Sequence, residues 1–156
     1  MAIEIERKFL VTSMEMLTGI SGEELSQGYL SHSADSTVRV RVAGEQGWLT
    51  IKGRTEGASR AEFEYPVPVE DARDLLGLCQ SGRIEKTRYR IPQPPHVWEI
   101  DVFHGDNQGL VVAEIELRSE QDRFDQPEWL GEEVTDDPRY FNSALSKHPW
   151  SHWKLS

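Results

Sequence analysis

Residues 37–42 read TVRVRV, with a valine at every second position and Arg39 and Arg41 between the valines. Successive side chains of a β-strand point to opposite faces, so a period of two is typical of a strand. The stretch therefore predicts a strand with one apolar face and one basic face.

The same period recurs along most of the chain. It predicts strands at Ala2–Val11, Thr37–Val42, Trp48–Arg54, Arg60–Val69, Arg83–Ile91, Val97–Phe103 and Leu110–Leu117, with shorter pieces at Gln27–Ser31 and Glu133–Thr135. Short turns that contain glycine, such as residues 44–47 (GEQG) and 56–59 (EGAS), separate neighbouring strands and favour antiparallel hairpins.

Two helices are expected between and after these strands. One begins near Glu70 and Asp71, whose charges suit a helix N-terminus, and the other covers residues 138–147 after Asp137. A weaker candidate lies at Met14–Leu17 or Gly22–Leu25. Many strands and few helices predict one mainly β (α+β) domain over residues 1–156, an antiparallel sheet curled into a barrel with helices outside or at one end.

The chain is acidic, with a formal net charge of −10 at pH 7 and a pI near 4.9. This charge argues against general binding of nucleic acids or anionic membranes, whereas a local cluster can still hold one small anion. The single cysteine, Cys79, excludes an intramolecular disulfide and a cysteine-rich zinc site. No signal sequence and no apolar run near the roughly 20 residues of a membrane span are visible, so a cytoplasmic protein is expected.

The polar faces of the predicted strands carry charges of one sign in pairs. The pairs are Glu4 with Glu6, Arg39 with Arg41, Glu62 with Glu64, Lys86 with Arg88, Glu99 with Asp101, and Glu114 with Glu116. Side chains two positions apart on a strand lie about 7 Å from each other, so like charges repel there. One interpretation is a solvated outer face with weak cross-strand ion pairs. The whole series favours an inverted barrel, with the charges inside and the apolar outer face covered by helices, a partner subunit or both.

A lumen of this kind suits a metal-bound chain of phosphates. Hard cations such as Mg²⁺ and Mn²⁺ prefer carboxylate and water oxygens, and Arg and Lys donate hydrogen bonds to phosphate oxygens. Phosphoryl transfer needs little beyond positioning and charge neutralisation. The pattern therefore predicts divalent-metal-dependent hydrolysis of a triphosphate without a nucleophilic serine or cysteine.

These motifs, in this order, resemble those of the CYTH superfamily, also called triphosphate tunnel metalloenzymes. They are E-x-E-x-K at residues 4–8, R-x-R at 39–41, T-x-K at 50–52, E-x-E at 62–64, K-x-R at 86–88, E-x-D at 99–101 and E-x-E at 114–116. The match covers nearly the whole chain. The resemblance implies an eight-stranded antiparallel closed β-barrel, the triphosphate tunnel, with a few flanking helices and a C-terminal helix near one mouth.

The resemblance also assigns roles to the charged residues. It places the triphosphate on Lys8, Arg39, Arg41, Lys52, Lys86 and Arg88. It gives the metal first to Glu4, Glu6, Glu114 and Glu116, and then to Glu62, Glu64 and Asp101. For the reaction itself, the chemistry of the site predicts attack by a water held on the metal, with Lys86 or Lys8 as general base in the alternative mechanism. Tyr29 either positions the water or the leaving group or simply packs.

Inorganic tripolyphosphate is the favoured substrate, because the motifs provide no obvious pocket for an organic group. The alternatives are thiamine triphosphate, a nucleoside triphosphate, adenylate cyclase activity, and a polyphosphate-binding module without turnover. The expected partner is a small-molecule triphosphate together with Mg²⁺ or Mn²⁺, and the chain is expected to be a monomer or a homodimer.

Overall fold

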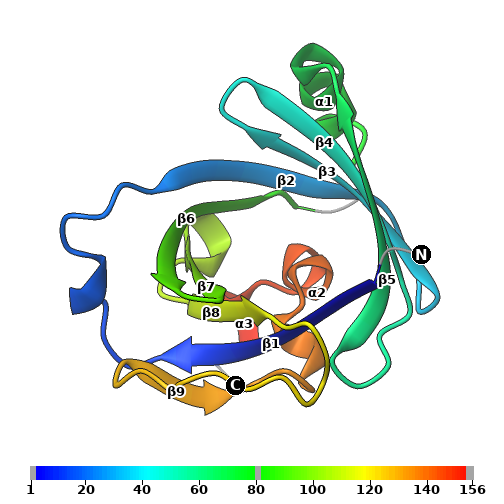
Figure 1. The fold of residues 1–156 in the computed structure, drawn as a ribbon. Coiled ribbons are helices and arrows are strands. Elements are labelled where there is room, and N and C mark those ends of the chain that lie inside the picture. The colour runs from blue at the N-terminus through cyan, green and yellow to red at the C-terminus, as the bar shows by residue number, and fades with distance from the viewer. Residues whose placement is uncertain (1–2, 80–81, 154–156) are drawn as a thin grey trace.

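The computed structural model describes residues 3–79 and 82–153, and its centre is a closed barrel of antiparallel strands (Figure 1). The sheet order is β5-β4-β3-β2-β6-β7-β8-β1, and pairing of β1 with β5 closes the ring. The strands are β1 (Ile3–Val11), β2 (Glu23–His32), β3 (Ser36–Ala43), β4 (Gln46–Gly53), β5 (Ser59–Val67), β6 (Ile84–Gln93), β7 (His96–Phe103) and β8 (Val111–Glu116). The eight-stranded antiparallel barrel implied by the resemblance is confirmed.

A ninth strand, β9 (Leu130–Glu133), lies outside the closed ring. β1 pairs with β8 along one edge and divides its other edge between two partners. Ile3–Ile5 pair with β5, whereas Phe9 and Val11 pair with β9. The predicted strand fragment at Glu133–Thr135 is therefore placed too late in the chain.

Three other predicted elements differ from the observed ones. Gly22–Leu25, one candidate for a helix, instead leads into β2, because Glu23–Gln27 pair with β6. Met14–Leu17 contains only the 3₁₀ turn η1 (Glu15–Leu17). The helix predicted over residues 138–147 is divided into η3 (Pro138–Tyr140) and α2 (Asn142–Lys147), because Phe141 between them has an extended backbone. The short helix α3 (Trp150–Trp153) follows Pro149.

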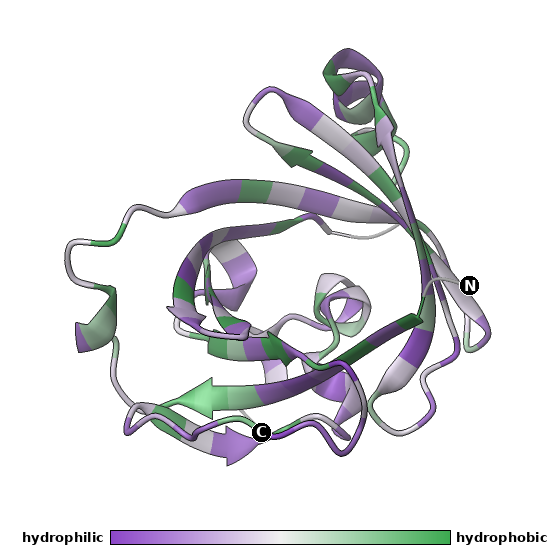
Figure 2. Ribbon diagram, viewed as in Figure 1, coloured by the Kyte–Doolittle hydropathy of each residue, from purple (hydrophilic) through white to green (hydrophobic). Residues whose placement is uncertain are grey.

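Hydrophilic and hydrophobic residues alternate along the barrel strands (Figure 2). The charged ones line the lumen, so the barrel is inverted and most of its apolar residues lie on the outer face. α1 (Val69–Leu76) covers one part of the outer face by packing Ala72 and Leu76 against Val40. The segment between β8 and β9 covers another part, where Phe124 and Trp129 pack against the fully buried Trp98. Helix α1 and the segment between β8 and β9 thus shield much of the apolar outer face from solvent, as an inverted barrel requires.

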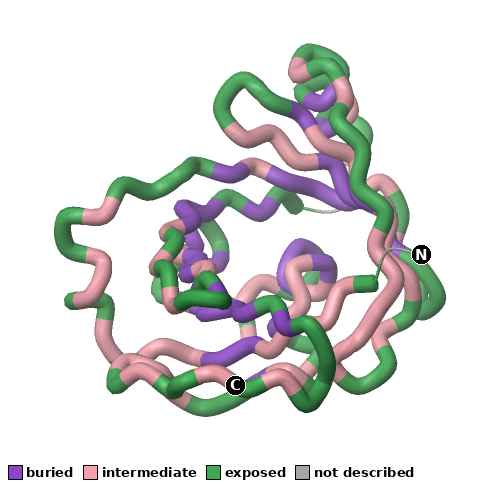
Figure 3. The backbone as a smooth tube through the Cα atoms, in the orientation of Figure 1, coloured by how far each residue is buried: buried purple, intermediate pink, exposed green. Residues whose placement is uncertain are grey.

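The outer face of β5 is the least covered region of the ring. Every residue of this strand is half-buried or exposed (Figure 3), and the side chains of Phe63 and Tyr65 remain 40% and 53% exposed. Both aromatic residues alternate with the lumen residues Glu62 and Glu64.

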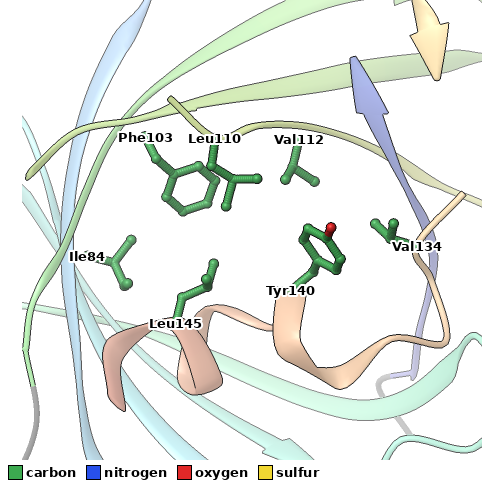
Figure 4. Packing of buried hydrophobic residues seen from close by; sticks show 7 residues of the cluster. All are labelled: Ile84, Phe103, Leu110, Val112, Val134, Tyr140 and Leu145. Atoms are coloured by element: carbon green, nitrogen blue, oxygen red, sulfur yellow. The ribbon is translucent and has the colours of Figure 1, made fainter. Parts of the chain in front are cut away.

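The C-terminal segment closes one end of the lumen with an apolar cluster (Figure 4). Leu145 of α2 and Tyr140 of η3 pack against Ile84 on β6, Phe103 on β7 and Val112 on β8. The inward face of these three strands is therefore apolar at this end and charged further along. The expected position of the C-terminal helix at one mouth is confirmed.

No helix within the two described ranges is long and apolar enough to cross a membrane.

Candidate active site

The lumen of the barrel contains a cavity of about 360 Å³. All six predicted triphosphate-binding residues line it: Lys8, Arg39, Arg41, Lys52, Lys86 and Arg88. So do Tyr29 and six of the seven predicted metal ligands: Glu4, Glu6, Glu62, Glu64, Glu114 and Glu116. Because side chains alternate between the two faces of each strand, the barrel brings together in its lumen residues that lie up to 112 positions apart, from Glu4 to Glu116.

Asp101, the seventh predicted ligand, lies behind the cations and is not one of the residues that line the cavity. Its carboxylate is fully buried and accepts two hydrogen bonds from Arg88, at 2.8 and 2.9 Å. Lys86 Nζ lies 2.7 Å from the same carboxylate. Although burial opposes ionisation, Arg88 and Lys86 hold the pKa of Asp101 well below its usual range. Asp101 is thus an ionised anchor whose oxygens are already occupied by these two cations.

The basic side of the lumen holds more positive charge than its carboxylates neutralise. Burial and the nearby Arg39 and Arg88 lower the pKa of Arg41 to about 9. Burial, together with Arg88 and Arg41, lowers the pKa of Lys86 to about 7 despite the attraction of Asp101. Mutual repulsion of buried cations is relieved when an anion binds between them, so this side of the lumen is suited to a phosphate chain.

Carboxylates face one another on the opposite side of the lumen. Glu6 on β1 lies directly opposite Glu116 on β8, a pairing that repels when both groups are ionised. Burial, Glu114 and Glu4 raise the pKa of Glu6 to about 8. Burial, followed by Glu4, raises the pKa of Glu116, which forms no ion pair within 4.0 Å in the described part of the chain. A cation between Glu6 and Glu116 would remove this repulsion.

The remaining lumen carboxylates are paired. Lys52 Nζ lies 3.0 Å from Glu4 and 3.3 Å from Glu62, and Lys8 Nζ lies 3.8 Å from Glu114. Arg39 lies 3.7 Å from Glu64, which also accepts a hydrogen bond from Thr50. Lys8 Nζ also lies 4.0 Å from Glu6, the longest of these contacts, so Glu6 and Glu116 are the least neutralised carboxylates of the lumen.

The donor set fits a hard divalent cation that is only partly held by protein. No three Asp, Glu, His or Cys side chains among residues 3–79 and 82–153 form a group that could hold a metal ion by themselves. Mg²⁺ is usually bound by one or two carboxylates and completes its shell with water and substrate phosphates. Glu6 and Glu116 supply such a pair of oxygen donors, and Glu4 is the next carboxylate along β1.

Several charged lining residues had no role assigned to them from the sequence, although Glu99 and Arg90 were expected on the polar faces of their strands. Glu23, Arg60, Arg90 and Glu99 add charge, and Arg90 pairs with Glu23 at 3.2 Å and Glu99 at 3.5 Å. The like-signed pattern of β6 already extended to Arg90, so a signal for it existed. Arg54, by contrast, pairs with Asp35 and does not line the lumen.

Phe141, Asn142 and the buried Gln27 were also missed. Phe141 and Asn142 line the closed end of the cavity, and the ring of Phe141 lies 5.0 Å from Lys8 Nζ. Gln27 is fully buried between Arg41 and Asn142. None of these residues is charged, so the pairing of like charges along strands gives no sign of them.

Comparison with known proteins places the chain among relatives of similar length. The sequence model of the CYTH domain matches residues 2–149. An inorganic triphosphatase of Acetivibrio thermocellus is 46% identical over 155 residues, which cover 99% of each chain. An inorganic triphosphatase of Nitrosomonas europaea is 40% identical over 151 residues, covering 92% of this chain and 96% of the relative.

The fold comparison agrees with the sequence comparison. A crystal structure of an inorganic triphosphatase superposes with a TM-score of 0.67 and 37% identity, covering 91% of this chain and 96% of the other. A protein from Pyrococcus horikoshii at 21% identity, with a TM-score of 0.60 over 75% of this chain and 79% of the other, shares the fold.

Proposed function

The chain belongs to the CYTH domain family, and from this premise we propose that it hydrolyses inorganic tripolyphosphate to pyrophosphate and phosphate with a divalent metal ion. The observation that carries the proposal is the division of one lumen of about 360 Å³ into a side crowded with cations and a side where Glu6 and Glu116 face each other with little neutralisation. A polyphosphate chain and a divalent cation complement these two sides respectively.

The basic residues bind and neutralise the phosphates. Arg39, Arg41 and Arg88 present guanidinium groups that match phosphate oxygens, and Lys8, Lys52 and Lys86 add point charges. As the bond between the terminal and middle phosphates breaks, negative charge moves onto the leaving pyrophosphate. Cations already fixed in the lumen stabilise that charge without reorganisation.

Lys86 acts mainly through its charge. Its ammonium group donates to Asn142 and contacts Asp101, and a bound phosphate would favour the protonated form over the neutral form. Lys86 and Lys8 both remain predicted alternatives for the general base. Tyr29, buried and lining the cavity, remains predicted either to position a reacting group or to pack.

Mg²⁺ or Mn²⁺ is the proposed metal, held by Glu6 and Glu116 with Glu4 and Glu114 nearby. When bound, a divalent cation supplies a Lewis acid for phosphate oxygens and for water. Glu62 and Glu64 support Lys52 and Arg39 in this proposal, and Asp101 serves Arg88 and Lys86 instead of the metal.

Thiamine triphosphate and nucleoside triphosphates are the alternative substrates, because they carry the same triphosphate. The closure of one end of the lumen by Phe141 and Asn142 favours the smaller inorganic chain. Cytoplasmic location and a monomeric or homodimeric state stay predictions from the sequence.

Phosphate release from tripolyphosphate, thiamine triphosphate, ATP and pyrophosphate tests the proposal. Each substrate is incubated with Mg²⁺, Mn²⁺ or a chelator. We expect metal-dependent release that is fastest for tripolyphosphate, with pyrophosphate left as a product. Faster release from thiamine triphosphate or ATP would assign that compound as the substrate in place of tripolyphosphate. No release from any triphosphate by the folded protein would contradict the enzymatic function.

A further inference from the structure

Two neutral side-chain amides connect two cations of the lumen. Arg41 Nε donates to Gln27 Oε1 at 2.7 Å, and Gln27 Nε2 donates to Asn142 Oδ1 at 3.3 Å. Lys86 Nζ donates to the same Asn142 oxygen at 2.9 Å. The chain of hydrogen bonds therefore runs from β3 through β2 and α2 to β6.

We refer to the hydrogen-bonded chain Arg41–Gln27–Asn142–Lys86 as the relay. The two cations at its ends fix the direction of every hydrogen bond in it. The guanidinium of Arg41 and the protonated ammonium of Lys86 can only donate, so an acceptor must face each of them. An amide offers both an acceptor and donors, so Gln27 can accept from Arg41 and donate onward. Asn142 Oδ1 then accepts two hydrogen bonds, which matches its two lone pairs. Neither amide can be reversed without breaking at least one contact.

The relay holds its cations differently from Asp101. Asp101 anchors Arg88 and Lys86 with a negative charge, and it lies behind the lumen wall. Asn142 lines the cavity itself, where a carboxylate would repel a bound phosphate chain. Neutral amides fix the cations in place and leave their charge available to an anion.

The relay also joins the lumen to the C-terminal segment. Asn142 is the first residue of α2, and α2 is seated by the fully buried Leu145 in the apolar cluster. Packing at the closed end therefore determines where the Asn142 oxygen lies. Gln27 on β2 is fully buried, so water cannot reach its amide to replace the hydrogen bond with Asn142.

We propose that Gln27 and Asn142 are positioning residues that hold Arg41 and Lys86 in the geometry that binds the triphosphate, so that substrate affinity depends on the docked C-terminal segment. The inference rests on the proposed function. Because the relay acts on groups that grip the substrate before and during reaction, its loss should weaken binding more than it slows turnover.

A double-mutant cycle tests the relay. Gln27→Leu, Asn142→Leu and the double variant are compared for kcat and KM with tripolyphosphate, and for binding of tripolyphosphate by calorimetry without divalent metal. Each single variant should raise KM and the dissociation constant about 10-fold, with kcat changed less than about threefold. The double variant should raise KM and the dissociation constant no more than the single variant with the larger effect, because the effects of substitutions within one network do not add. Two independent 10-fold effects that multiply would overturn the relay.

Asn142→Asp separates positioning from support of the fold. This variant keeps the acceptor oxygen for Lys86 and Gln27 but adds a negative charge to the lumen. It should keep the melting temperature of the wild type and still raise KM about 10-fold or more. A wild-type KM in this variant would contradict the requirement for a neutral amide.

Leu76→Ala is the matched control: Leu76 is a buried leucine of α1 that packs against Val40 on the outer face and does not line the lumen. It should lower the melting temperature while KM, measured well below that temperature, stays within about twofold of the wild type. An increase in KM as large as that of Asn142→Leu would assign the effect to general loosening and overturn the relay. A wild-type protein that neither binds nor hydrolyses tripolyphosphate would overturn the proposed function. Wild-type KM values in Gln27→Leu and Asn142→Leu would overturn the relay alone.

Discussion

Two halves of the same lumen differ completely, although the same strands build both. On β6 the inward side chain changes from Ile84 to Lys86, and on β8 it changes from Val112 to Glu114, each within two residues. The apolar half is filled by Tyr140 and Leu145 from the C-terminal segment. The charged half is a cavity that keeps opposed carboxylates and crowded cations.

The contrast shows how a barrel can tolerate repulsion at its centre. Burial of apolar side chains stabilises a fold by about 1.5–3 kcal/mol for each fully buried large residue. The closed end and the covered outer face provide this stabilisation away from the site. The charged half can therefore retain charge that only a ligand neutralises, and substitutions in the two halves should have different consequences.

The largest expected effect is the loss of activity in Glu116→Gln. This change removes a proposed metal ligand and should lower kcat for tripolyphosphate roughly 10³-fold. It also removes repulsion with Glu6 and Glu4, so the melting temperature in chelator should be unchanged or higher. The control is Glu85→Gln, which alters a carboxylate that binds Ser26 outside the lumen and should leave activity within about twofold. A folded Glu116→Gln protein with full activity would show that the metal assignment is wrong.

Asp101→Asn should instead act on stability. It leaves the buried cations Arg88 and Lys86 without their counter-charge, and breaking such a pair costs about 3–5 kcal/mol. For a chain of this size each kcal/mol corresponds to about 2–4 °C in melting temperature. Thermal unfolding should therefore move down by roughly 6–20 °C. A shift of less than about 2 °C would contradict the role of Asp101 as an anchor.

Leu145→Ala tests the apolar half. Truncation of a fully buried leucine leaves a cavity and costs about 2–5 kcal/mol, so chemical denaturation should show this loss. Because Leu145 seats the helix that carries Asn142, kcat/KM should fall at most about 10-fold, far less than in Glu116→Gln. Large loss of activity with unchanged stability would remove the distinction between the two halves.

The pH dependence of metal binding tests the carboxylate pair. Because the pKa of Glu6 is raised to about 8 in the fold, its protonated form contributes stability that is fully present below its ordinary pKa near 4.5. That contribution is lost as pH rises through about 8. Mg²⁺ replaces the proton, so the increase in melting temperature on adding Mg²⁺ should grow between pH 5 and 8, reaching roughly 3–8 °C. Glu6→Gln should abolish this growth, and a pH-independent Mg²⁺ effect would argue against a site at Glu6.

The smallest effect is expected for Tyr29→Phe. Tyr29 is buried in the lumen wall beside Arg39 on the neighbouring strand. If its main role is packing, loss of the hydroxyl should change kcat less than about threefold and stability by less than about 1.5 kcal/mol. A 100-fold loss of kcat would restore the predicted catalytic role.

Much of the fold could be predicted because the barrel is inverted. Charged and apolar residues alternate in Ile3–Glu6 of β1 and throughout Val38–Val42 of β3, so the sequence marks both faces of these strands. β2 was predicted only over Gln27–Ser31, about half of its length, because its inward face mixes Leu25, Gln27 and Tyr29. The division of the C-terminal helix depends on the extended backbone of Phe141, which tertiary packing sets and which local propensity does not indicate.

The site was predictable as a set of charges but not as a set of roles. The E-x-D motif at Glu99 and Asp101 looks like the E-x-E motifs, yet Asp101 is covered by Arg88 and Lys86. Burial and register decide this, and they depend on neighbouring strands. The contact between Gln27 and Asn142 joins uncharged residues 115 positions apart, so no local pattern reveals it.

The most direct test is a crystal structure with tripolyphosphate and Mn²⁺, in which anomalous scattering locates the metal. We expect a Mn²⁺ peak between Glu6 and Glu116, phosphates against Arg39, Arg41 and Lys86, and an unchanged apolar half. A triphosphate bound outside the lumen, or a metal peak at Asp101 instead of at Glu6 and Glu116, would contradict this assignment of the site.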